Sequence, residues 1–133
     1  NEQKLPGIVN FMSANDVVSK EKEQQLMQTI NNLYVSNDYE KALSEINNLN
    51  NSDRKYLWQG VCYLQLNNTP KAVDALQKAQ ALKSIYSDEI QWFLALAYVQ
   101  ENETEKAITL FQKLSNNQGY KAKEANDWLK KLR

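Results

Sequence analysis

The side chains that could carry out covalent chemistry are few in this sequence. The 133 residues include one cysteine, Cys62, and no histidine. A catalytic thiol needs a neighbouring base and an electropositive setting, and no histidine exists to serve as that base. Cys62 lies between Val61 and Tyr63 in an apolar helical stretch. We therefore expect it to be a core residue.

Acidic residues gather at three places that could be considered for acid–base chemistry. These places are Glu21/Glu23, Asp88/Glu89 and Glu101/Glu103/Glu105. Each falls at an expected helix start or turn, where the helix dipole already accounts for negative charge. The sequence has no phosphate-binding glycine loop and no EF-hand spacing. It predicts no catalytic residue, no metal ligand and no cofactor, and hence a protein that is not an enzyme.

The charge balance argues against two classes of partner. Lys plus Arg and Asp plus Glu both number 16, so the formal net charge is zero. Nucleic-acid binding depends on a basic patch that displaces counterions, and electrostatic membrane docking depends on a basic cluster. No apolar run approaches the roughly 18 residues of a membrane span. We expect a protein or peptide partner, no nucleic acid, and no membrane insertion by this segment.

Apolar periodicity and cap residues predict an all-α chain. Glycine and proline are scarce, with three and two residues. Residues 1–18 contain Pro6 and Gly7 and lack a sustained helical period, so we expect an extended N-terminal arm there. Residues 19–133 are expected to form three helical hairpins, at about 19–49, 52–83 and 87–115, and a capping helix at about 120–132.

One short motif occurs three times, as NDYEKAL from Asn37, NNTPKAV from Asn67 and NETEKAI from Asn102. Each copy has Asn first, Lys fifth, Ala sixth and an aliphatic residue seventh. Asn tolerates the left-handed conformation that often ends a helix. We therefore expect each motif to form the turn of a helical hairpin, with the Lys in solvent and the small Ala facing the first helix.

The hairpins resemble tetratricopeptide repeats, whose pattern is roughly W-x2-L-G-x2-Y followed by A-x3-F. The second hairpin has Tyr56-x2-Gln59-Gly60-x2-Tyr63 and then Ala72-x3-Leu76, and the third has Leu94-Ala95-x2-Tyr98 and then Ala107-x3-Phe111. The first hairpin fits less well, because Ile30 replaces the small residue. The resemblance implies an α–α superhelix made of the three hairpins and the capping helix.

The resemblance also implies where a partner would bind. In such stacks the first helix of each hairpin lines a concave peptide-binding groove. The positions that correspond here are Met27, Asn31, Tyr34, Leu57, Val61, Leu64, Trp92, Leu96 and Val99. This set is almost entirely apolar, so a clamp for a terminal carboxylate is not expected.

The stretch IQWFLALAYVQENETEKAITLFQKL also resembles small bacterial tetratricopeptide proteins that carry one N-terminal membrane anchor. That resemblance implies an anchor before Asn1 and leaves the side of the membrane open.

Two functions follow from this sequence. The first is a non-catalytic protein–protein interaction module that binds a partner segment in the apolar groove. The alternative is a structural scaffold, self-associating or membrane-tethered, without a transient ligand. An exposed apolar groove is rarely left empty. Its occupant could be the N-terminal arm (Leu5, Ile8, Val9 and Phe11), a second copy of the chain, or a partner peptide.

Overall fold

The chain is entirely helical over the part that the structure describes. The computed structural model describes the backbone of residues 6–133 and the side chains from residue 20 onward. Within this range it contains seven α-helices and no strand. Their bounds are α1 Pro6–Val35, α2 Tyr39–Ile46, α3 Asp53–Gln65, α4 Thr69–Ala81, α5 Ser87–Gln100, α6 Thr104–Asn117 and α7 Ala122–Leu132. The predicted all-α class, with three hairpins and a final helix, is confirmed.

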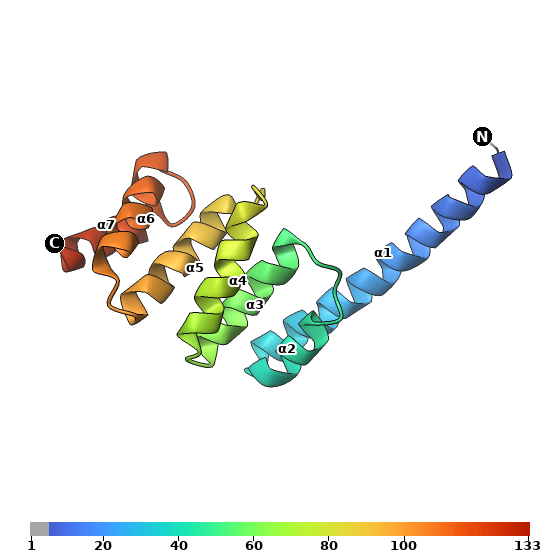
Figure 1. The fold of residues 1–133 in the computed structure, drawn as a ribbon, viewed down its shortest axis with the longest axis horizontal. Coiled ribbons are helices and arrows are strands. Elements are labelled where there is room, and N and C mark those ends of the chain that lie inside the picture. The colour runs from blue at the N-terminus through green and yellow to red at the C-terminus, as the bar shows by residue number, and fades with distance from the viewer. Residues whose placement is uncertain (1–5) are drawn as a thin grey trace. The chain divides into compact units, whose positions relative to one another are not determined.

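The helices fall into two compact units, Asn1–Leu49 and Asn50–Arg133. The first unit holds the hairpin of α1 and α2, which pack against each other. In the second unit each helix from α3 to α7 packs against the next one, and α3 also contacts α5 (Figure 1). The first helices of two successive hairpins therefore lie side by side, which is the arrangement expected of stacked helical repeats.

The N-terminal segment differs from the sequence prediction. Instead of an extended arm over residues 1–18, the structure has helix α1 beginning at Pro6. Proline suits the first turn of a helix because its missing N–H has no partner there. Beyond Gly7 no proline or glycine interrupts α1, so the backbone continues as a helix without the apolar period on which the prediction relied. Residues 1–5, and the arm side chains considered as occupants of the groove, lie outside the described part.

In the described part of the chain, no helix combines the length and apolar character needed to cross a bilayer. The longest, α1, has 30 residues, but its sequence alternates apolar with polar and charged positions.

The three repeated Asn residues form the hairpin turns, as predicted. Asn37, Asn67 and Asn102 have φ values of 65°, 60° and 60°. In each turn the N–H of the next residue donates to the carbonyl five positions earlier, at 2.8 Å for Asp38 to Leu33 and 2.9 Å for both Asn68 to Tyr63 and Glu103 to Tyr98. This bond closes the helix end in the Schellman pattern. The same local geometry therefore sets the entry of α2, α4 and α6.

The small residue of the repeated motif lies where the paired helices meet. Ala42, Ala72 and Ala107 are each 0% exposed. Between α3 and α4, Gly60 faces Leu76. A methyl group added to Gly60 would lie 2.5 Å from Leu76 Cγ. The absence of a side chain at Gly60 is what allows α4 to sit at this distance from α3.

The lysine of the motif packs over an aromatic ring in two of the three hairpins. Lys71 Nζ lies 5.8 Å from the centre of the Tyr63 ring, and Lys106 Nζ lies 5.5 Å from that of Tyr98. Both distances are within the range of a cation–π contact. Each tyrosine also supplies the carbonyl that closes its turn. One residue therefore holds the turn through both its backbone and its side chain.

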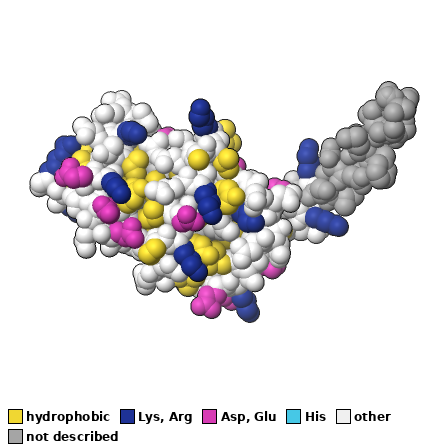
Figure 2. Space-filling view, in the orientation of Figure 1, with side chains coloured by type: hydrophobic (Ala, Val, Ile, Leu, Met, Phe, Trp, Pro, Cys, Tyr) yellow, Lys and Arg dark blue, Asp and Glu magenta, His cyan; other side chains and the backbone are white. Residues whose placement is uncertain are grey.

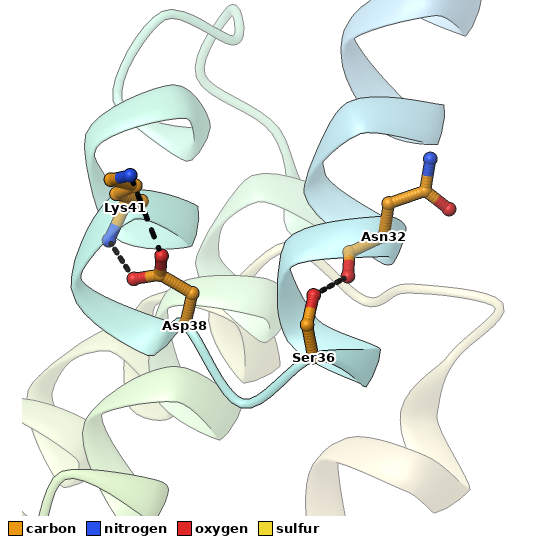
Figure 3. A network of polar contacts seen from close by, with 4 residues as sticks. All are labelled: Asn32, Ser36, Asp38 and Lys41. Atoms are coloured by element: carbon orange, nitrogen blue, oxygen red, sulfur yellow. Dashed lines mark hydrogen bonds and ion pairs between the residues drawn. The ribbon is translucent and has the colours of Figure 1, made fainter.

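The turn of the first hairpin uses polar contacts instead, because Leu33 occupies the position of the tyrosine. Asp38 caps α2 by accepting the Lys41 N–H at 3.4 Å, and Lys41 Nζ lies 3.8 Å from its second carboxylate oxygen. Nearby, the Ser36 hydroxyl donates to the Asn32 carbonyl (Figure 3). These exposed contacts are individually weak.

A row of three aromatic rings joins α5, α6 and α7. Trp92 and Phe111 meet edge to face at 5.7 Å, and Phe111 stacks on Trp128 at 5.7 Å with an interplanar angle of 1°. Lys121 and Lys131 lie over the outer rings, at 5.6 Å from Trp92 and 5.0 Å from Trp128. Aromatic pairs of this kind stabilise beyond their buried area. They fix the final helix as a cap on the third hairpin.

Cys62 lies in the core of α3, as predicted. Its side chain is 0% exposed, and burial raises the pKa of the thiol from 9.0 to about 11. The thiol therefore stays protonated and unreactive at neutral pH.

Substitution of Gly60 by alanine tests the close contact between α3 and α4. We expect Gly60→Ala to lower the free energy of unfolding by about 1–2 kcal/mol, because overpacking outweighs the gain in helix propensity. Urea denaturation followed by circular dichroism measures the change. Gly119→Ala is the control, since the nearest atom to its added methyl group lies at 3.9 Å.

A Leu76→Ala background makes the Gly60 test specific. With the obstructing side chain removed, Gly60→Ala should become neutral or stabilising. An equal loss in both backgrounds would show that the contact with Leu76 is not its cause.

Because the Cys62 thiol is buried, we expect its contribution to the free energy of unfolding to decline as the pH rises. Because the folded pKa of Cys62 lies above the unfolded value, the folded state holds the proton longer, and stability is lost as pH rises from the unfolded pKa toward the folded one. We expect the stability of the wild type relative to Cys62→Ala to fall by about 1 kcal/mol between about pH 8 and pH 10. Urea denaturation of both proteins at each pH measures it. A pH-independent difference would contradict the assignment.

Candidate functional site

The nine residues predicted to line a groove are distributed over three helices. Those of α1 belong to the first unit, and those of α3 and α5 belong to the second. In the first unit Met27 is half-buried, Asn31 is exposed, and the Tyr34 ring meets that of Tyr39 at 5.3 Å. The remaining six can be compared directly, because α3 and α5 are in contact.

A partly open groove lies between α3 and α5, and it is referred to below as the α3–α5 groove. Its volume is about 140 Å³, and its lining residues are Val61, Leu64, Gln65, Phe93, Leu96 and Gln100. The spacing of three or four positions along each helix places these side chains on one helical face. Four of the lining residues are apolar, and the other two are glutamines, one from each helix.

Three predicted residues meet in this groove, and three residues were missed. Val61, Leu64 and Leu96 line it as the sequence analysis proposed for a binding surface, and Gln65, Phe93 and Gln100 join them. No sequence signal identified Phe93, because α5 is apolar on nearly every side. The two glutamines resembled ordinary helix-end residues. Each is the last residue of its helix and lies two positions before the left-handed Asn of the turn, and that position could have drawn attention to them.

The other three predicted residues of the second unit lie elsewhere. Trp92 is 9% exposed and packs against Phe111 of α6, so its ring belongs to the core. Leu57 and Val99 are partly buried and pack against the same core. The structure therefore does not bring these three side chains to the α3–α5 groove.

The α3–α5 groove has no ionisable side chain among its lining residues. A second hollow between α3 and α4, of about 270 Å³, is by contrast polar, with Gln59, Tyr63, Lys71, Asp74, Ala75 and Lys78 around it. Its charges are engaged locally, since Lys78 pairs with Asp74 at 3.2 Å and Lys71 lies over Tyr63. Figure 2 shows basic and acidic groups interspersed over one face of the molecule. The apolar groove is the more distinctive of the two hollows.

One hydrogen bond between hairpins fixes an edge of the α3–α5 groove. The hydroxyl of Thr69, the first residue of α4, donates to Oε1 of Gln100, the last residue of α5, at 2.8 Å. Thr69 is 8% exposed, so this hydroxyl has little access to water. The bond holds the Gln100 amide beside the apolar floor.

The carboxylates at the two ends of α5 do not converge. Asp88 and Glu89 lie in the first turn of α5, and Glu101 is its C-terminal cap residue. At 1.5 Å per residue, the ends of this helix are roughly 20 Å apart. In the part of the chain that the structure describes, no group of three or more His, Cys, Asp or Glu side chains is placed to hold a metal ion.

Comparison with known proteins gives a match to one family. Residues 56–82 and 94–118 match the model of the tetratricopeptide repeat. These segments correspond to most of the α3–α4 and α5–α6 hairpins, whose first helices form the groove. No curated protein and no solved structure matches the chain. The family match covers less than half of the sequence, and it supports the assignment of these two hairpins as tetratricopeptide repeats.

Proposed function

We propose that this chain is a non-catalytic protein–protein interaction module that binds a segment of a partner protein in the α3–α5 groove. The observation that carries the proposal is the apolar groove formed by the first helices of two successive hairpins, both of which match the tetratricopeptide repeat. Such repeats generally mediate protein–protein interactions. Met27, Asn31 and Tyr34 of the first hairpin remain predicted partner-binding residues of the first unit.

The apolar lining supports binding through burial of hydrophobic surface. Covering a leucine-sized side chain contributes roughly 1.5–3 kcal/mol. Association and ordering of a partner segment cost several kcal/mol. Leu96 and Phe93 of α5 are still half-buried rather than buried in the free chain. A partner that covers both of them would contribute toward that cost, whereas Val61 and Leu64 are only 7% and 8% exposed and add little.

A polar substitution in the groove tests this proposal. We expect Leu96→Asn to abolish retention of a partner from an extract of the source cells, because the amide would be desolvated by the partner without a hydrogen bond. The measurement is an affinity pull-down with the full chain as bait, competition by free wild-type protein, and identification by mass spectrometry.

Ile108→Asn is the matched control, since Ile108 is a half-buried aliphatic residue of α6 that does not line the groove. Circular dichroism establishes that both variants are folded. If the Leu96 and Ile108 variants retained the same proteins as the wild type, the groove would not be the binding site. If the wild type retained itself alone and formed larger species with concentration, the scaffold function would replace the one proposed here.

A further inference from the structure

The amide of Gln100 is a polar group of the groove whose orientation is fixed by the fold. Thr69 Oγ1 donates to Gln100 Oε1 at 2.8 Å, and Gln100 lines the α3–α5 groove. A glutamine amide carries one acceptor oxygen and two N–H donors. The oxygen accepts the threonine proton through one of its two lone pairs, which leaves both N–H donors of the amide available to a ligand. The fold therefore presents a hydrogen-bond donor beside an apolar floor.

We propose that Gln100, positioned by Thr69, donates a hydrogen bond to a main-chain carbonyl of the bound segment, whose neighbouring aliphatic side chain occupies the groove. The bound segment is an uncharged internal stretch of a partner protein and not a chain terminus. This inference rests on the proposed function, and it adds the chemistry that the partner must have.

The charges around the groove favour an uncharged occupant. None of the six lining residues is ionisable. A carboxylate or ammonium entering the groove would lose hydration without gaining an opposite charge. Glu101 directly follows Gln100 in the sequence, Glu103 lies two residues further on, and both are exposed. Their negative charges further disfavour a C-terminal carboxylate at this edge.

The size of the groove limits what the partner inserts. A volume of about 140 Å³ is close to that of a dry apolar cavity that accommodates a benzene molecule. One branched aliphatic side chain fits this space. An inserted aliphatic group gains little specificity by itself. The oriented Gln100 amide supplies the directional contact that selects a peptide backbone next to that side chain.

A model dipeptide tests the chemistry directly. The probe is N-acetyl-leucine N′-methylamide, which has one leucine side chain between two peptide groups. It is titrated into the ¹⁵N-labelled full chain, and the amide shifts of groove residues are followed. A ligand of this size should bind with a Kd on the order of millimolar. N-acetyl-leucine, which ends in a carboxylate, and N-acetyl-lysine N′-methylamide should each bind at least about fivefold more weakly.

Substitutions at the two bonded residues test the positioning role. Thr69→Val and Gln100→Ala should each weaken binding of the leucine probe by about three- to tenfold, which is the effect of one neutral hydrogen bond. The double variant should be no weaker than either single variant, because both remove the same contact. Thr69→Ser keeps the hydroxyl and should restore binding. Thr104→Val is the control, since Thr104 begins α6 as Thr69 begins α4.

The outcomes separate this inference from the proposed function. If the leucine probe binds and Leu96→Asn abolishes binding, but Thr69→Val and Gln100→Ala bind like the wild type, the groove function stands and the role of Gln100 is overturned. Equal or tighter binding of the carboxylate or lysine probe overturns the uncharged partner.

If no probe binds, but the pull-down finds a partner whose retention depends on the groove, this inference alone is overturned. Failure of both experiments overturns the proposed function as well. Sedimentation velocity on the same samples detects a dimer that covers the groove, which would make a second copy the occupant and overturn the inference.

Discussion

The Asn-centred turn within each hairpin is the constraint on which the rest of the structure depends. A left-handed Asn lets the next N–H bond to a carbonyl five residues earlier, so the second helix always leaves the first with the same geometry. The Ala that follows at the helix contact, and Gly60 in the second hairpin, then let the helices close on each other. Because the second and third hairpins share this geometry, their first helices, α3 and α5, can stack side by side. The α3–α5 groove is the surface that this stacking leaves partly open.

The two sides of α5 are both apolar, but they pack differently. Toward α6 and α7, Trp92 meets Phe111, which in turn stacks on Trp128, so large rings fill the space. Toward α3, the facing residues are the smaller Val61 and Leu64, and a groove remains. Exposed charged residues on α7 solvate the far side of the cap, as a terminal element of a repeat stack requires. The stack is therefore closed at the cap and partly open between its first helices.

Local chemistry made part of this structure predictable from the sequence. The turns, the buried Ala positions and the buried Cys62 each depend on a single residue type in a recognisable setting, and all were found as expected. The start of α1 was missed because the prediction required an apolar period, whereas the backbone of residues 6–18 is helical without one. Phe93 was missed in favour of Trp92 because α5 is apolar on nearly all sides. The apolar pattern of α5 then does not show which side of the helix faces the core. Packing against α6 decides which ring is buried.

The polar edge of the groove could not be predicted at all, since it depends on two residues 31 positions apart. Thr69 is an ordinary helix-start residue and Gln100 an ordinary helix-end residue until stacking brings them together. The same bond connects the two hairpins, so it belongs both to the stability of the stack and to the surface offered to a ligand. A ligand that binds the oriented amide binds the stacked state in preference to any state in which the hairpins separate, and by linkage it stabilises that stack. Recognition and the packing of successive repeats are thus coupled through one hydrogen bond.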